Sequence, residues 1–250
     1  MSTLDDIKRE LVLANRILAR EDVVDAYGHV SVRHPDDPSR YLLSRSRAPE
    51  LVEVSDIMEF ALDGTPVGDS KMQPYLERFI HGAIYEVRPD VNAVVHAHAE
   101  DTLPFGIAGA QKLVPVIHSG AFIGGAVPVW DIADAFGDAT NLLVTNVAQG
   151  RDLAKTLGEG RVSLMRGHGF AAAAPSLIDV VRLSVYLPRN ARVQMNAMRM
   201  GDFKPLSAGE IGERSGGETY CPNSLATWRA WEYWAYRAKC EGLLGSRPTA

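Results

Sequence analysis

The stretch Ala93-Val94-Val95-His96-Ala97-His98 decides the fold. It is a short apolar run that contains β-branched residues, which is typical of a buried strand, and it ends in two histidines. A helical pattern over residues 76–87 comes just before it, and Arg88-Pro89-Asp90 ends that helix. The stretch therefore predicts a buried strand that directly follows a helix.

Helical and strand patterns mix along the whole chain, which favours a single α/β domain over residues 1–250. Residues 201–220 are polar and rich in glycine, and they predict a loop or mobile arm that leads into a C-terminal aromatic helix within 201–250. Pro188 is expected to kink or break a long helix. The predicted helices are 4–20, 76–87, 132–137, 139–150, 152–157, 177–200 and 223–244; the predicted strands are 27–33, 41–44, 57–62, 93–98, 117–118, 127–129 and 161–165.

Composition excludes several classes of protein. The 250 residues carry 26 basic and 31 acidic side chains, a net charge of −5, which argues against a nucleic-acid partner. The longest apolar stretch, 169–175, is far shorter than the roughly 18 residues that span a membrane. The N-terminus lacks a basic segment followed by an apolar one, so we expect a cytoplasmic protein with no membrane partner.

The C-terminal helix carries Trp228, Trp231 and Trp234. These rings could line an aromatic pocket, but their pattern favours packing in the core or at a subunit interface. The two cysteines, Cys221 and Cys240, cannot form a disulfide framework and are expected to be reduced thiols.

His96 and His98 are two residues apart on the predicted strand. Alternate residues of a strand point to one face, so both imidazoles can reach one metal ion. The same pattern also fits two half-buried histidines that bind nothing, and spacing alone leaves the choice open.

Two further features have the chemistry of metal ligands. His168 lies between Gly167 and Gly169, and flanking glycines let the backbone pass close to a ligand. Glu77 lies near the start of the helix before the histidine strand, with His81 one turn further on. Each could equally be a solvated side chain. Together, three imidazoles and a carboxylate suit Zn²⁺, Mn²⁺, Fe²⁺ or Co²⁺, and such an ion acts as a Lewis acid.

In order and spacing, these motifs resemble the class II aldolase/adducin family. The matching pieces are the first helix, Asp25-Ala26-Tyr27-Gly28-His29-Val30-Ser31-Val32-Arg33, Glu77 with His81, His96-Ala97-His98 and Gly167-His168-Gly169. The resemblance implies a three-layer α/β/α domain with a central, mainly antiparallel sheet. It also implies a divalent metal held by His96, His98 and His168, with Glu77 as a further ligand or a proton-transfer group, and a homotetramer with its sites at subunit interfaces.

Departures from the family's sugar-phosphate aldolases concern the substrate. Tyr75-Leu76 stands where those enzymes carry two small serines, His29 follows the early glycine, and Arg47 replaces a glycine that lets a phosphate approach. A phosphorylated sugar is therefore a poor fit. The fork-shaped guanidinium of Arg47 suits a carboxylate instead, and Ser46 and His118 are further candidates for substrate binding.

The same residues resemble a decarboxylase branch of the family, whose members act on hydroxylated aromatic or pyridine dicarboxylates. We therefore expect a lyase that removes CO₂ through an enolate stabilised by the metal, with Mn²⁺ favoured over Zn²⁺, Co²⁺ or Fe²⁺. Glu77 and His29 are the candidate proton donors. An aldolase with a non-phosphorylated or acidic substrate, a dehydratase and a non-catalytic binding module are the alternatives.

Overall fold

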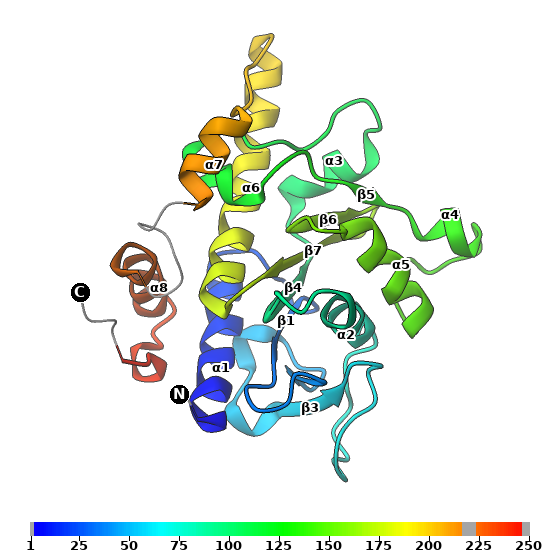
Figure 1. The fold of residues 1–250 in the computed structure, drawn as a ribbon, viewed down its shortest axis with the longest axis vertical. Helices are drawn as coiled ribbons and strands as arrows, with labels where there is room; N and C mark the ends of the chain where they lie inside the picture. Colours follow the sequence, from blue (N-terminus) through cyan, green and yellow to red (C-terminus); the bar gives the residue numbers. More distant parts are fainter. Residues whose placement is uncertain (1–2, 217–223, 247–250) are drawn as a thin grey trace.

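The computed structural model describes residues 3–216 and 224–246, and it contains one seven-stranded sheet (Figure 1). The strand order is β3-β2-β1-β4-β7-β6-β5, and every neighbouring pair is antiparallel except β5 and β6. The prediction of a mainly antiparallel sheet is therefore confirmed. The strands are β1 (His29–Arg33), β2 (Arg40–Ser44), β3 (Ile57–Ala61), β4 (Ala93–Ala97), β5 (Val129–Trp130), β6 (Val162–Met165) and β7 (Gly169–Ala174).

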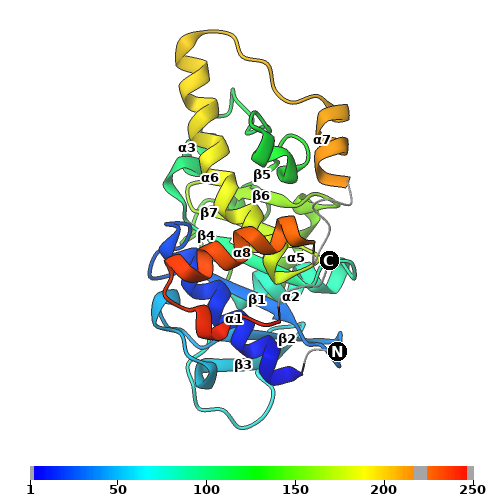
Figure 2. The same ribbon diagram turned by 90° about the vertical axis from the view of Figure 1, so that its left-hand side faces the viewer.

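Helices cover both faces of this sheet, so the domain has the three layers that the family resemblance implies. Helices α1, α6 and α8 lie on one face, and α2 and α5 lie on the other (Figures 1 and 2). The helices are α1 (Leu4–Arg20), α2 (Arg78–Val87), α3 (Leu103–Ile107), α4 (Ile132–Phe136), α5 (Val147–Leu157), α6 (Leu177–Met200), α7 (Ala208–Gly216) and α8 (Leu225–Arg237).

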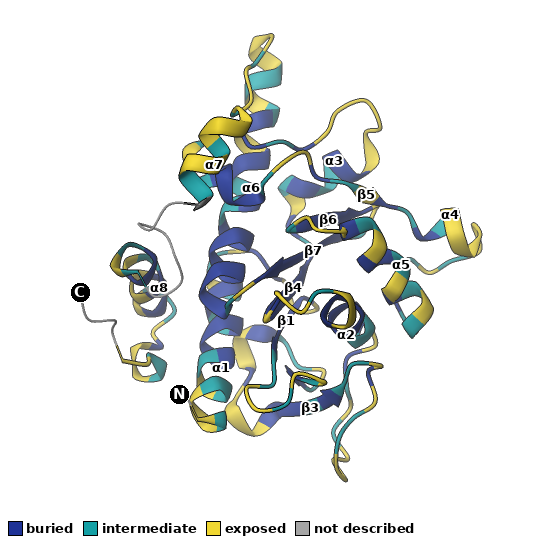
Figure 3. Cartoon of the chain, in the orientation of Figure 1, coloured by how far each residue is buried: buried dark blue, intermediate teal, exposed yellow. Residues whose placement is uncertain are grey.

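Strand β4 shows why the sheet is buried on both faces. Val95 packs into the core formed with α1, α6 and α8, whereas Val94 packs into the core formed with α2 and α5. The continuous apolar run Ala93-Val94-Val95 suits this double burial, and Figure 3 shows the inner strands buried between the helical layers. The three tryptophans of α8 are buried in the first core, so they pack as core residues, as the sequence favours.

Some predicted elements are wrong. Residues 117–118 are not a strand, because His118 begins a short 3₁₀ helix, His118–Ile123. The helical pattern over 139–150 forms a helix only from Val147, where the Asn146 side chain accepts the Gln149 N–H and caps the helix.

The predicted loop over 201–220 is wrong where it contains α7. Ser207 caps this helix, since its Oγ accepts the Glu210 N–H at 3.2 Å and its own N–H donates to Glu210 Oε2 at 2.7 Å. The polar composition hides this capping box; residues 217–220 lie outside the described part of the chain.

Strand β7 was missed, whereas helix α6 spans the predicted range, 177–200. The alanines of β7 have high intrinsic helix propensity, yet the segment pairs with β4 and β6 on its two sides. Helix α6 continues through Pro188 as one element, so the proline does not break it.

None of the helices within residues 3–216 and 224–246 is both long enough and apolar enough to cross a membrane. Cys240 is a buried free thiol, and Cys221 lies outside the described residues.

Candidate metal centre

His96 and His98 lie at the end of β4, in the middle of the sheet. His96 is directly opposite His29 of β1 in the strand pairing, and its side chain is fully buried. The Nε2 atoms of His96 and His98 are 3.0 Å apart, as expected when alternate residues share a face.

His168 reaches the same place from the turn between β6 and β7. Its N–H donates to the Met165 carbonyl at 3.0 Å, and Gly167 adopts a φ of +65°, which an L-residue adopts only at a cost. The His168 ring centroid lies 4.9 Å from that of His96 and 5.0 Å from that of His98. The turn thus adds a third imidazole to the pair on β4.

Glu77 directly precedes α2, which begins at Arg78 rather than at residue 76 as predicted. Its Oε1 accepts the Val144 N–H at 3.0 Å, and its Oε2 lies 3.4 Å from His96 Nε2 and 3.5 Å from His168 Nε2. One ligand atom from each of Glu77, His96, His98 and His168 lies within 4.8 Å of all the others. The structure therefore brings together the four residues that the sequence selects as candidate ligands.

The hydrogen bonds at Nδ1 of His96 and of His98 fix which nitrogen of each ring carries the hydrogen. His96 Nδ1 faces the Phe170 carbonyl at 3.0 Å, and His98 Nδ1 faces both carboxylate oxygens of Asp25 at 3.2 Å. Both partners only accept, so each Nδ1 carries the hydrogen and each Nε2 presents a lone pair. Two lone pairs that face each other at 3.0 Å repel, unless a cation lies between them.

This donor set fits a divalent cation. Four ligands placed tetrahedrally about 2.0–2.2 Å from an ion are separated by ~3.3–3.6 Å. The separations His96–His98, Glu77–His96 and Glu77–His168, at 3.0, 3.4 and 3.5 Å, are close to this range, and all four ligand atoms lie within 4.8 Å of one another. Backbone or carboxylate acceptors behind ligating histidines are the usual support of a metal site. The four residues can therefore hold Zn²⁺, Mn²⁺, Fe²⁺ or Co²⁺.

The electrostatics of the cluster keep its ligands ready to bind. Burial opposes ionisation of Glu77, but the imidazoles of His96 and His168 and the Val144 N–H outweigh it and lower the pKa of Glu77 to about 2. Burial, with the nearby His96 ring, lowers the pKa of His168 to about 4 and also lowers the pKa of His98. The carboxylate is thus ionised and these imidazoles are neutral near pH 7, which are the forms that bind metal.

His29 lies beside the cluster, and Tyr75 connects it to the loop that carries Arg47. The His29 ring centroid is 5.1 Å from that of His96 and 4.5 Å from that of Tyr75. The Tyr75 hydroxyl donates to the Arg47 carbonyl, and Ser46 N–H donates to Gln73 O at 2.8 Å. The loop that contains Ser46 and Arg47 is therefore tied to the segment that leads into Glu77.

The Arg47 guanidinium is not free of partners. Its Nη1 lies 2.6 Å from Asp56 Oδ2 and 3.6 Å from Glu53, and Arg45 binds the other oxygen of Asp56 at 2.6 Å. Within the described residues, Nε and Nη2 of Arg47 make no hydrogen bond. These two atoms can still meet a carboxylate of a substrate.

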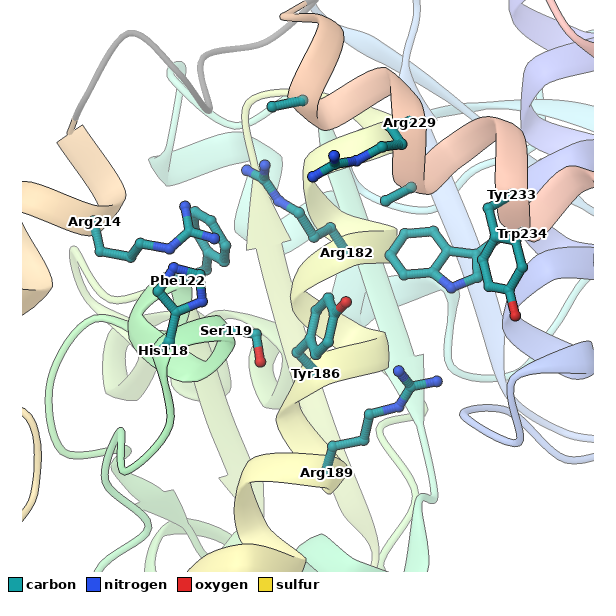
Figure 4. A pocket seen from close by; sticks show the side chains of 12 residues that line it. His118, Ser119, Phe122, Arg182, Tyr186, Arg189, Arg214, Arg229, Tyr233 and Trp234 are labelled. Carbon is teal, nitrogen blue, oxygen red and sulfur yellow. The ribbon is translucent and has the colours of Figure 1, made fainter.

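His118 lies in a different pocket of about 360 Å³, whose lining includes none of the four cluster residues. Figure 4 shows it beside Phe122 and Arg214, and the Arg182 guanidinium lies over the Phe122 ring, 3.9 Å from its centroid. Within one subunit, the structure therefore does not bring His118 to the cluster.

A second cavity, of about 630 Å³, reaches the cluster from the side of His98. Its wall includes Asp25 together with the acidic Glu100 and Asp101 and the basic Arg189 and Arg192. Because His98 forms part of this wall, the cavity connects the cluster with the protein surface.

The sequence interpretation missed the supporting residues. Asp25 anchors His98 and is itself held by the N–H groups of Tyr27 and Gly28, at 2.8 and 3.1 Å. Nothing local to Asp25 indicates this role, because its partner lies 73 residues away.

Comparison with known proteins agrees with this geometry. Residues 9–195 match the model of the family described as Class II Aldolase and Adducin N-terminal domain. The chain is 34% identical to the decarboxylase tropJ of Talaromyces stipitatus over 94% of this chain and 95% of that protein. It is 29% identical to the 3,4-dihydroxyphthalate decarboxylase of Arthrobacter keyseri, over 82% and 85% respectively.

Solved structures agree on the fold. An aldolase II superfamily protein from Pseudomonas syringae superposes with a TM-score of 0.77 at 20% identity, covering 97% of this chain and 96% of that one. The chain therefore belongs to the class II aldolase and adducin family, and it is similar to decarboxylases of that family over most of its length.

Proposed function

We propose that the protein is a divalent-metal-dependent decarboxylase of a hydroxylated aromatic or pyridine dicarboxylate. The observation that carries the proposal is the complete Glu77, His96, His98 and His168 cluster in a chain whose long-matching relatives include decarboxylases. Tyr75 supports the choice of substrate, because this buried residue stands at the position where the resemblance places a small serine in the sugar-phosphate aldolases of the family.

The three histidines and Glu77 would hold the ion. When bound, a divalent cation there supplies Lewis-acid chemistry, since it stabilises negative charge that develops next to the breaking carbon–carbon bond. The protein's part is to keep four ligand atoms in place and to exclude water from His96, which is fully buried.

Glu77 and His29 then have separate roles. Ionised Glu77 takes the proton of the ring hydroxyl next to the carboxylate and returns it to the ring carbon that bears this carboxylate. The carbon–carbon bond breaks, its electron pair returns to the ring, CO₂ leaves, and the hydroxyl oxygen regains a proton from water. His29 lies beside the cluster and contacts the same substrate.

We propose Mn²⁺ as the ion, and a homotetramer with the sites at subunit interfaces as the assembly. Metal analysis of the purified protein and light scattering on a sizing column test these two points.

Decarboxylation is tested by CO₂ release. Purified protein with Mn²⁺ is expected to release CO₂ from hydroxy-dicarboxylates of benzene or pyridine, and a chelator should abolish the release until Mn²⁺ is added back. A matched ring without the hydroxyl next to the carboxylate is the control and should not react. An aldehyde product from a non-phosphorylated hydroxy-keto acid, without CO₂ release from any dicarboxylate, would instead favour the aldolase alternative.

Arg47 is proposed to bind the second carboxylate. Replacing it with methionine keeps the stem but removes a charge-assisted hydrogen bond, so KM for the dicarboxylate should rise about 10- to 100-fold. KM for a hydroxy-monocarboxylate should change little. Arg45→Met is the matched control, since Arg45 binds the same Asp56; equal effects of both variants on the dicarboxylate would contradict the assignment.

A further inference from the structure

A chain of buried polar side chains runs from His29 away from the metal cluster. His29 Nδ1 lies 2.7 Å from His81 Nε2, His81 Nδ1 lies 2.6 Å from Ser31 Oγ, and Ser31 Oγ lies 2.8 Å from the Tyr85 hydroxyl. All four side chains are at most 1% exposed.

The local structure explains the alignment. His29 and Ser31 are alternate residues of β1, so they share a face, and His81 and Tyr85 are one turn apart on α2. Strand β1 and helix α2 each contribute two of the four side chains, and residues of the strand and of the helix alternate along the series of hydrogen bonds.

The hydrogen bonds of this chain have a direction, which Tyr85 sets. Burial raises the pKa of Tyr85, so its hydroxyl keeps its hydrogen, and Ser31 Oγ is its hydrogen-bond partner within the described residues. A buried hydroxyl needs an acceptor, so Tyr85 donates to Ser31. Ser31 in turn donates to His81 Nδ1.

This direction determines which ring nitrogen carries the hydrogen in each of the two histidines. Since His81 Nδ1 accepts, the hydrogen of the neutral ring lies on Nε2 and is donated to His29 Nδ1. His29 therefore carries its own hydrogen on Nε2, an atom that makes no hydrogen bond within the described residues. The reverse direction would leave the Tyr85 hydrogen without an acceptor, which disfavours it by on the order of ten- to a hundredfold.

We propose that Tyr85, Ser31 and His81 are positioning residues that hold His29 as a neutral imidazole with its hydrogen on Nε2, so that His29 donates a hydrogen bond to a substrate oxygen. As far as it concerns the substrate, this inference rests on the proposed decarboxylase function. It makes His29 a donor rather than a base at Nε2, and leaves proton removal to Glu77.

Nitrogen-15 NMR of histidine-labelled protein loaded with diamagnetic Zn²⁺ tests the proposal directly. The His29 signals, assigned by their loss in His29→Asn, are expected to show a protonated Nε2 and an unprotonated Nδ1. A hydrogen on Nδ1 of His29 would overturn the proposal. Failure to release CO₂ would count against the proposed function alone, because the spectrum reports the tautomer without turnover.

Ser31→Ala removes the hydrogen-bond donor to His81. Ser163→Ala is a matched control, because Ser163 is equally buried in the same sheet but takes no part in these hydrogen bonds. Ser31→Ala is expected to add a second His29 tautomer to the spectrum and to lower kcat about tenfold, with metal content and KM unchanged. Ser31→Thr should restore both the spectrum and kcat. If the spectrum and kcat of Ser31→Ala match those of Ser163→Ala, the positioning role is wrong.

Discussion

Replacing His98 with alanine is expected to remove bound metal and catalytic activity together. The variant loses one of three Nε2 donors, and the remaining three ligands bind a divalent ion much more weakly. Because a Lewis acid supplies several kcal/mol of transition-state stabilisation, CO₂ release should fall by about 10³-fold or more. Elemental analysis of the purified variant and a CO₂-release assay measure the two effects.

His34→Ala is the matched control, because His34 lies in a turn where its ring accepts the N–H groups of Asp36 and Asp37. It should retain both metal and activity. If His98→Ala purified with the same metal content as the parent protein, or kept its activity, the ligand assignment would be wrong. Excess Mn²⁺ should restore part of the activity only if weak binding is the cause of the loss.

The candidate ligands could be predicted from the sequence because each depends on local geometry. Strand periodicity puts His96 and His98 on one face, and the glycines around His168 allow the close turn that carries it. Their meeting point depends instead on the pairing of β4 with β7, and β7 was not predicted. Only the order of the motifs along the chain, compared with the family, indicated that these distant parts converge.

Other side chains of the site contact partners that are not adjacent in the sequence, so the sequence does not indicate these contacts. Arg47 was expected to bind a carboxylate of the substrate, and the sequence did not indicate that it also shares Asp56 with Arg45. Ser31 and Tyr85 look like an ordinary strand residue and an ordinary core residue, and only the packing of α2 against β1 makes them a hydrogen-bonded chain. Such contacts follow from the tertiary fold, so periodicity cannot reveal them.

Replacing the glycine after His168 with alanine is expected to lower both stability and metal affinity. A Cβ on Gly169 would overlap the carbonyl oxygen of Ala97 and lie 3.1 Å from Cδ2 of His98. Gly169→Ala must therefore displace the end of β4, which carries two of the three histidine ligands. Overpacking of this kind costs about 1–3 kcal/mol of unfolding free energy, and displaced ligands should weaken metal binding about 10- to 100-fold.

Gly167, on the other side of His168, is the matched control, because its backbone conformation rather than a close contact favours a glycine there. Its φ is +65°, and a Cβ there would have only Leu142 Cδ1 nearby, at 3.9 Å. Asparagine tolerates a positive φ, so Gly167→Asn should keep most of the stability and metal affinity. Chemical denaturation and metal titration compare the two variants. Equal losses in both would mean that the turn tolerates no side chain at either position, and that contact with β4 is not the reason for a glycine at 169.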